Sequence, residues 1–240
     1  MTSHPGRLGH TWEHWHWDAE AKSTAVQLSP CQQAVYFHTN MLLESEGSAG
    51  VRGTKGFCYG EHYWEIEFIE PPYGTSVMVG LGTKQALLHS GKTPFLNLLG
   101  MDGESWGLSY KGSLWHNGKS KKYTEAFYDK STVIGVLLDL ESGALRFYRN
   151  GISLGLAFTG LDKVARPLYP LVSSTAPETE LRLGLRTHRL TSLQDSCLHV
   201  ISKSIRPQAH LDSLPLPLSM CEQLHITTNT GQHQKLFGQV

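Results

Sequence analysis

Residues 133–155 read VIGVLLDLESGALRFYRNGISLG and predict three β-strands joined by two tight turns. The first strand is apolar, partly β-branched and too short to be a buried helix. Apolar and basic residues then alternate in part along ALRFYR, as expected for a strand with one face on a core and one in water. Asn150-Gly151 is the strongest short-range hairpin signal, because a type I′ turn needs positive φ at both central residues. The predicted strands are 133–138, 145–149 and 152–156.

The same stretch carries a family resemblance. From Gly135 to Gly151 the sequence follows G-V-x-L-D-x-x-x-G-x-L-x-F-Y-x-N-G and resembles the signature of SPRY (B30.2) domains. Three further blocks agree with that family: Gly60–Ile66, Val79–Gly82 and Ser105–Leu108. Together the blocks cover roughly residues 15 to 185. The resemblance implies a mainly β protein, a two-sheet antiparallel sandwich whose loops bind peptides and which has no catalytic machinery of its own.

Composition and charge limit the functions open to the chain. Its 240 residues suffice for one large all-β domain with a small appendage. Lys plus Arg and Asp plus Glu are both 21, so no net charge draws the protein to nucleic acid or an acidic membrane surface. The four cysteines are widely spaced and the N-terminus lacks the apolar core of a signal peptide, which predicts reduced thiols in the cytoplasm or nucleus. No apolar run approaches about 18 residues, so no membrane span is expected.

A tryptophan pair opens the predicted domain. Trp15 and Trp17 are two residues apart, so a strand would direct both indoles to one face, where they pack in the core. His10, His14 and His16 have no cysteine or carboxylate partner at a recognised spacing, so packing is favoured over a metal site.

The next segment predicts short strands at 25–28, 34–38 and 63–69, with a polar loop at 44–50. Between them, Val51–Gly56 places Arg52 and Lys55 between glycines. This run does not match the GxxxxGK[ST] phosphate loop, because Lys55 precedes its glycine and no helix pattern follows. Nucleotide binding is therefore not expected.

A strand at 76–82 precedes the longest irregular stretch of the domain. Its Gly80 and Gly82 indicate a close approach of neighbouring backbone. Residues 84–100 form the irregular stretch, and long loops in compact domains are commonly binding surfaces. Phe95, Leu98 and other apolar residues within it predict a small satellite cluster, an exposed apolar patch, or both.

The second half of the domain predicts more strands and no catalytic site. Strands are expected at 105–110, 113–116 and 181–185, with a solvated hairpin tip at 117–122. The prolines of Pro167–Val172 favour an edge strand there, followed by a loop at 175–177. No nucleophile elbow, HExxH or CxxC frames the Ser, His and Asp residues, so the sequence predicts neither an enzyme nor a cofactor.

From Thr191 the periodicity changes from two to nearly four. Thr191–Gln194 has the form of a capping box and Pro207 ends the pattern, which predicts a helix of about four turns. Leu214–Pro217 then predicts a stiff extended segment, and residues 218–224 one further short helix. The apolar stripe of the first helix contains Leu193, Cys197, Val200, Ile201 and Ile205.

This tail resembles a SOCS box. Ser192-Leu193-x-x-x-Cys197-x-x-x-Ile201 is similar to the elongin C-binding box of SOCS-box proteins. Leu214-Pro215-Leu216-Pro217 is similar to their cullin-5 box, although Gln223 stands where a tyrosine is often found. The resemblance implies elongins C and B and cullin-5 with a RING protein as partners. It assigns elongin binding to Leu193, Cys197, Val200 and Ile201, and cullin binding to Leu214, Pro215, Leu216 and Pro217.

The whole chain is identified as a member of the SPRY-domain SOCS-box proteins, most like their type 3 branch. The resemblance implies a substrate receptor of a ubiquitin ligase that binds a short, Asn-containing degron and promotes degradation of its target. Two alternatives are a peptide-binding adaptor that recruits no ligase and a lectin-like glycan binder. The expected divisions are a tail at 1–11, the SPRY domain at 12–188, the SOCS box at 189–226 and a second tail at 227–240.

The resemblance also implies a substrate-peptide site at one end of the sandwich. Arg52 matches a loop arginine of the family, and Thr75, Phe95 and Leu98 match loop positions. Thr175-Ala176-Pro177 replaces the Val-Trp-Gly of other members, which removes an indole and a backbone N–H. The pocket is therefore expected to persist with an altered preference. Its expected residues are Arg52, Thr75, Phe95, Leu98, Thr175 and Ala176.

Overall fold

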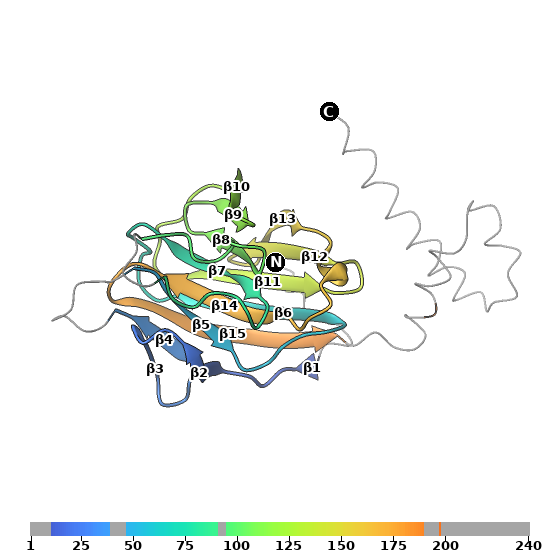
Figure 1. Cartoon of the computed structure of the whole chain (residues 1–240), viewed down its shortest axis with the longest axis horizontal. Coiled ribbons are helices and arrows are strands. Elements are labelled where there is room, and N and C mark those ends of the chain that lie inside the picture. Colours follow the sequence, from blue (N-terminus) through green and yellow to red (C-terminus); the bar gives the residue numbers. More distant parts are fainter. Residues whose placement is uncertain (1–10, 39–46, 91–94, 190–196, 198–240) are drawn as a thin grey trace, which may run out of the picture. The chain divides into compact units, whose positions relative to one another are not determined.

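Strands β11 (Thr132–Asp139), β12 (Ala144–Arg149) and β13 (Ile152–Phe158) form an antiparallel meander in the computed structural model of the chain (Figure 1). The structure describes residues 11–38, 47–90, 95–189 and 197. In the second turn Asn150 and Gly151 have φ of 51° and 78°, as a type I′ turn requires. The amide of Val133 donates to Asn150 Oδ1 at 2.8 Å. The meander predicted for residues 133–155 is confirmed.

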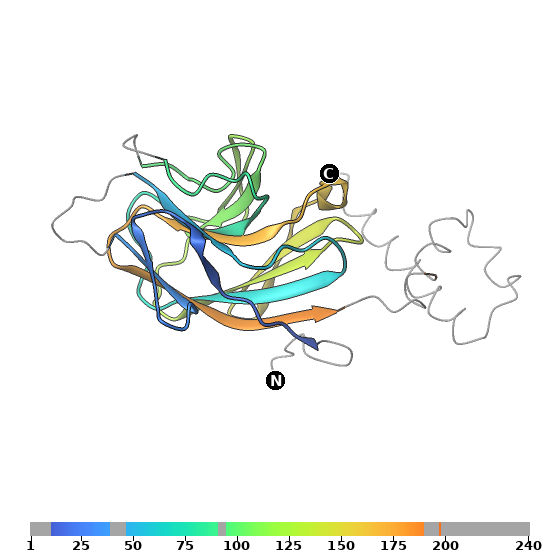
Figure 2. The ribbon, with the colours of Figure 1, turned by 60° about the horizontal axis from the view of Figure 1, so that its bottom comes forward.

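Two antiparallel sheets form the sandwich, and the strand order in each differs from the order of the chain. The first runs β13–β12–β11–β6–β15–β4–β3, with β1 pairing on β15; Figure 2 shows β15 as a long orange strand beside β6. The second runs β10–β9–β8–β7–β14–β5–β2. The predicted mainly β, two-sheet sandwich is confirmed.

The other strands of the two sheets are between two and eleven residues long. In the first sheet they are β1 (Thr11–Trp12), β3 (Val26–Leu28), β4 (Ala34–Phe37), β6 (Glu61–Phe68) and β15 (Thr179–Arg189). In the second they are β2 (Trp17–Lys22), β5 (Ala49–Gly53), β7 (Val77–Gly82), β8 (Ser105–Ser109), β9 (Ser113–His116), β10 (Lys119–Lys122) and β14 (Tyr169–Ser174). One 3₁₀ helix, η1 (Leu161–Lys163), follows β13.

The core lies between the sheets and is rich in aromatic side chains. Alternate residues of β6 point inward, and Trp64, Ile66 and Phe68 are each at most 1% exposed. On the neighbouring strands, Leu138 pairs with Leu145 and Val136 with Phe147, all of them fully buried. Each such side chain stabilises the fold by about 1.5–3 kcal/mol relative to its exposed state.

The tryptophan pair packs in this core as predicted, but the backbone between the two residues is not a strand. Trp15 and Trp17 are 3% and 0% exposed, and their rings meet edge to face with centroids 6.1 Å apart. The strand β2 begins only at Trp17. Arg186 reaches across to donate to the Trp15 carbonyl at 2.7 Å and lies over the indole at 5.6 Å, which holds this irregular segment in place.

Three sequence predictions for the second sheet are wrong in placement. Residues 49–53, predicted as a loop and a glycine-bracketed basic run, form the buried strand β5. The proline-containing β14 is central rather than at an edge. Pro170 pairs with Leu81 of β7 but lies just outside the ladder with β5, which begins at Leu171–Arg52. Residues 119–122, predicted as part of a hairpin tip, form the edge strand β10, and the turn itself is Asn117–Gly118.

Glycines on β7 and β8 allow backbone and loop to approach the outer face of the second sheet. A Cβ on Gly80 would lie 2.0 Å from the Trp106 carbonyl oxygen, which confirms the predicted close approach. A Cβ on Gly107 would lie 2.6 Å from Leu99 Cβ. The segment after β7 therefore lies against this face, where Leu99 and Ala86 pack in a small buried cluster with two strand residues, Met78 and Leu171.

A buried carboxylate fixes the N-terminal segment to the first sheet. Glu13 has a side chain 1% exposed, and its Oε1 accepts from Lys55 Nζ at 2.8 Å and lies 3.2 Å from His62 Nδ1 and 3.5 Å from His188 Nδ1. Burial raises the pKa of the Glu13 carboxyl, but hydrogen bonds and charge from His62 and Lys55 outweigh burial and hold the pKa below its ordinary value. The Glu13 amide also donates to the Arg186 carbonyl at 2.9 Å, so the segment is held by backbone and side chain together.

The chain divides into two compact units, residues 1–190 and 191–240. The sandwich belongs to the first. In the second, Cys197 is the described residue; it is helical and exposed.

Gly80→Ala is expected to lower the free energy of unfolding by about 3 kcal/mol, because the new methyl group overlaps the Trp106 carbonyl and forces β7 and β8 apart. Gly103→Ala is the matched control, since its Cβ would meet nothing closer than 4.0 Å, and it should change stability by no more than about 0.5 kcal/mol. Urea unfolding of both variants measures the difference. Equal stability of the two variants would contradict the close packing of β7 on β8.

Glu13→Gln is expected to destabilise the domain at neutral pH by about 2 kcal/mol, because a buried charged acceptor is lost. Since the folded-state pKa of Glu13 is lowered, its contribution is complete above the ordinary value of 4.5 and is lost as pH falls through the lower folded value. The stability gap between wild type and variant should therefore narrow below pH 4.5. Urea unfolding as a function of pH checks this, with Glu180→Gln, a partly exposed ion-pair residue, as the control. A gap independent of pH would count against the ionised pair.

Candidate functional site

The end of the sandwich where β14 ends and β7 begins brings two predicted loops together. Thr175 Oγ1 accepts from the Ser76 amide at 2.9 Å and donates to the Ser76 carbonyl at 3.1 Å. Beside this pair, the missing side chain of Gly74 leaves room for Ala176, because a Cβ on Gly74 would lie 3.1 Å from Ala176 Cβ. The loop before β7 and the loop after β14 are thus clasped, and Thr75, Thr175 and Ala176 are close together.

Burial separates these three predicted residues into two roles. Thr175 and Ala176 are 4% and 1% exposed, so their side chains hold the loops together rather than offer contact area. Thr75 is exposed. The first two positions of the 175–177 loop therefore face inward.

The long loop reaches the same end through Ser48. Its hydroxyl donates to the Leu96 carbonyl at 2.8 Å and accepts from the Leu96 amide at 2.9 Å, while the next residue, Ala49, pairs with Ser174. Phe95 is 45% exposed, whereas Leu98 is 2% exposed and lies 3.2 Å from the Cβ position of Gly50. The predicted satellite cluster forms beneath the loop, and Phe95 is half-exposed at the surface.

Arg52 does not lie in a loop, contrary to the sequence prediction. It is in β5, its side chain points to the outer face of the second sheet, and it is 8% exposed. Its Nη1 donates to the Lys84 carbonyl at 2.9 Å and its guanidinium lies over the Tyr169 ring at 5.1 Å. Tyr169 pairs with Gly82, whereas Thr175 lies beyond Ser174 at the other end of the ladder. Arg52 therefore anchors the start of the long loop and is not grouped with Thr75 and Thr175.

Sequence reasoning missed two residues at the clasped end. His38 has φ of 51°, is 9% exposed, and its Nε2 lies 3.2 Å from the Ser174 carbonyl. Burial lowers the pKa of His38, although the carbonyl contact opposes it, so the neutral ring is favoured as a donor. Tyr73 is 50% exposed and its hydroxyl donates to the Pro177 carbonyl. An aromatic residue between prolines and a glycine in a turn was the available signal for Tyr73; His38 had none.

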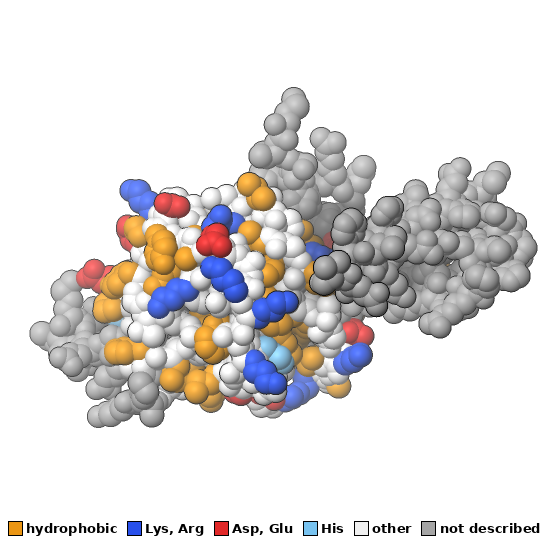
Figure 3. All heavy atoms as spheres, turned by 90° about the horizontal axis from the view of Figure 1, so that it is seen from above, with side chains coloured by type: hydrophobic (Ala, Val, Ile, Leu, Met, Phe, Trp, Pro, Cys, Tyr) orange, Lys and Arg blue, Asp and Glu red, His pale blue; other side chains and the backbone are white. Residues whose placement is uncertain are grey.

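The edge of the second sheet carries lysines. Lys119, Lys121 and Lys122 lie on β10 and are exposed. The face seen in Figure 3, from the side of β10 in Figure 1, shows Lys and Arg side chains interspersed with apolar ones. Lysines on an exposed edge discourage pairing with another chain, so this edge is protected against aggregation.

Most of the predicted SOCS-box residues lie outside the described residues. These are Leu193, Val200, Ile201, Leu214, Pro215, Leu216, Pro217 and Gln223.

The described part of the chain also bears on metal sites and membrane spans. Within residues 11–38, 47–90 and 95–189 and at 197, no three His, Cys, Asp or Glu side chains are placed to hold a metal ion. In the same residues, no helix has the length and apolar character needed to cross a membrane.

Comparison with known proteins agrees with the fold and extends it. Residues 61–185 match the SPRY domain family. Over 204 residues the chain is 40% identical to SPRY domain-containing SOCS box protein 3 of Xenopus laevis, covering 85% of this chain and 55% of that protein. Over 190 residues it is 32% identical to SPRY domain-containing SOCS box protein 2 of Rattus norvegicus, covering 73% and 70%.

Solved structures show the same architecture. The SPRY domain of human HERC1 has a TM-score of 0.55 at 20% identity, covering 70% of this chain and 96% of that one. The TRIM65 PSpry domain has a TM-score of 0.54 at 25% identity, covering 72% and 90%. The sandwich is thus a SPRY domain. The chain belongs to the family of SPRY domain-containing SOCS box proteins. The chain spans 55% of the length of the type 3 relatives that it matches, which is about half.

Arg52→Ala is expected to loosen the loop that starts at Thr83, because the Lys84 carbonyl loses its donor. Hydrogen exchange of the Ala86 amide, which donates to the Thr83 carbonyl, should accelerate about tenfold. The control is Arg182→Ala, which removes an exposed arginine paired only loosely with Glu180 at 3.4 Å. Unchanged exchange in the Arg52 variant would mean that Arg52 does not anchor the loop.

Proposed function

We propose that this chain is the substrate-recognition subunit of an elongin BC/cullin-5 RING ubiquitin ligase. The SPRY domain binds a short peptide degron of a target protein, and the C-terminal segment binds the ligase. The target is then ubiquitinated and degraded by the proteasome. The proposal places the protein in the cytoplasm, the nucleus or both.

The observation that carries this proposal is the family relationship, supported by the order of the motifs. The relatives are named for a SPRY domain and a SOCS box, and the two box-like motifs follow the SPRY domain of this chain. Either motif alone is a weak pattern, but their order after the sandwich is specific. The family relationship favours a ligase subunit over an adaptor that recruits no ligase and over a glycan binder.

The proposed mechanism needs two binding surfaces and no catalytic residue. Leu193, Cys197, Val200 and Ile201 contact elongin C, and Leu214–Pro217 contacts cullin-5. Bringing the target and a ubiquitin-loaded enzyme into one complex raises the effective concentration of target lysines near that enzyme. The protein therefore acts through proximity.

The target surface is the clasped end of the sandwich. Thr75 and Phe95 are exposed there and are suited to contact a peptide. Thr175, Ala176 and Leu98 are buried and support the loops from below. Arg52 acts at a distance by anchoring the long loop at Lys84. The proposed degron is a short, Asn-containing segment.

Leu193→Ala combined with Cys197→Ala is expected to abolish capture of elongins B and C by the full chain, because two apolar side chains on one face of the predicted helix are lost. Each truncation should weaken binding by about 2 kcal/mol or more, which is about 30-fold. Binding is measured with purified elongin B–C complex by titration calorimetry, alongside thermal unfolding of the SPRY domain.

Cys58→Ala is the matched control, because Cys58 is an exposed free cysteine of the first unit. It should bind elongins as the wild type does. Failure of the wild type to bind at micromolar concentration would overturn the ligase proposal. Unfolding of the SPRY domain in the double variant would instead make the tail part of the sandwich core.

A further inference from the structure

Two tyrosines provide much of the exposed ring surface at the clasped end of the sandwich. Tyr73 is 50% exposed and Tyr128 is 60% exposed. Thr175 and Ala176, which were predicted to contact the peptide, are buried beside them. A peptide arriving at Thr75 can therefore contact these tyrosine rings, whereas the side chains of Thr175 and Ala176 are covered.

Both rings are tied to the same turn. The Tyr73 hydroxyl donates to the Pro177 carbonyl, which bridges the two clasped loops. Tyr128 packs edge to face on Tyr110 with centroids 5.8 Å apart and planes at 83°. Tyr110 is 3% exposed, and its hydroxyl donates to the carbonyl of Gly74 at 2.7 Å. Exposed rings held in this way bury large areas on binding at a low entropic cost.

Charged groups of both signs lie near these rings. Lys111 Nζ donates to the Thr75 carbonyl at 2.8 Å and lies 5.5 Å from the centroid of the Tyr110 ring. Burial and, to a lesser degree, the nearby charge of Glu178 raise the pKa of Tyr73. The charge around the rings is thus mixed, and it favours neither an anionic nor a cationic ligand. The exposed apolar faces of the two rings are the surface that a partner can bury.

We propose that Tyr73 and Tyr128 form a second contact surface for the target peptide, which binds an apolar or aromatic side chain flanking the Asn-containing core. This inference rests on the proposed function, since the same peptide occupies the clasped loops and the two rings. The two rings adjoin the clasped loops. Tyr73 immediately precedes Gly74-Thr75, and Tyr128 packs on Tyr110, whose hydroxyl donates to the Gly74 carbonyl. The two tyrosines would therefore set which Asn-containing segments are chosen.

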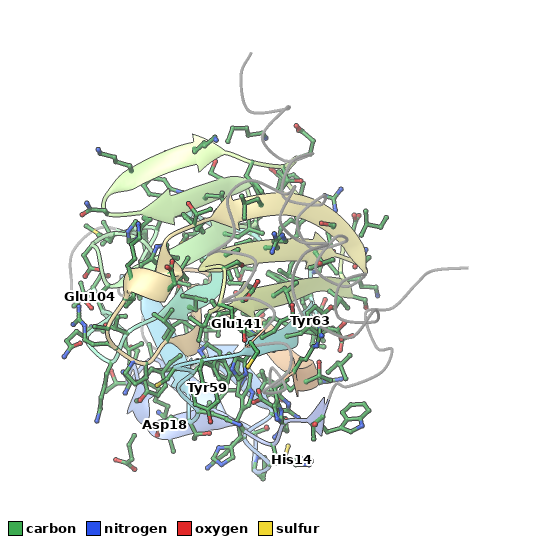
Figure 4. All side chains as sticks on the ribbon, turned by 90° about the vertical axis from the view of Figure 1, so that its right-hand side faces the viewer. His14, Asp18, Tyr59, Tyr63, Glu104 and Glu141 are labelled. Carbon is green, nitrogen blue, oxygen red and sulfur yellow. The ribbon has the colours of Figure 1, made fainter. Side chains whose placement is uncertain are left out.

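The test compares two sets of synthetic peptides on the full chain. Both have a central run of asparagines; one set is flanked by Leu, Phe or Pro and the other by Gly and Ser. Binding is measured by titration calorimetry for wild type, Tyr128→Ala, Tyr128→Phe, Tyr73→Ala and the double alanine variant. Tyr59→Ala is the matched control, because Tyr59 is 71% exposed at the other end of the sandwich, where Figure 4 labels it.

The wild type should prefer the apolar flanks by about tenfold, which corresponds to one or two aromatic contacts. The double alanine variant should lose this preference while still binding the Gly/Ser-flanked peptides. Tyr128→Phe and Tyr59→Ala should retain the preference. Equal preference in wild type and double variant would overturn this inference alone. Absence of any peptide binding by the wild type would overturn the proposed function together with it.

Discussion

The pairing of β14 with both of its neighbours is the constraint on which the functional end depends. Ser174 is opposite Val77 on β7 and opposite Ala49 on β5. This one register brings the loop before β7, the loop after β14 and the Ser48 contact of the long loop to the same edge. Because strand side chains alternate, a slip of one residue would turn the core residues of β14 outward and separate the loops. The position of the site thus depends on sheet register. Its buried residues Thr175 and Ala176 continue the contact between the two loops just beyond the end of the ladder.

Local sequence signals predicted those parts of the fold whose causes are local. The turn at Asn150-Gly151 needs positive φ at adjacent residues, which this dipeptide supplies without help from the rest of the chain. Gly80 likewise signalled close packing, because few other reasons place glycine inside a strand. The sandwich could therefore be predicted from these local signals together with the resemblance of several blocks to one family.

Predictions failed where tertiary packing, and not the local sequence, determines the structure. Gly50 and Gly53 suggested a loop around Arg52, yet their missing side chains make room for Leu98 and Trp15 on a buried strand. Pro170 suggested an edge, but it pairs with Leu81 of β7 and lies just beyond the ladder with β5, so its missing N–H removes no pair on the β5 side. The peptide site was predicted from position within a family, and position says nothing about burial, so the burial of Leu98 and Arg52 was not foreseen.

The position of β15 has a consequence for the order in which the protein assembles during synthesis. This strand is the last of the sandwich, yet it lies between β6 and β4, and β1 pairs on it as well. Until residues 179–189 have left the ribosome, β3 and β4 have no place in the first sheet and β6 has an open edge. Contacts between the two ends of a domain form slowly, since a long loop must close first. The nascent chain therefore leaves one edge of the aromatic-rich β6 unpaired until β15 emerges, a period in which protection by chaperones matters more than the stability of the finished fold.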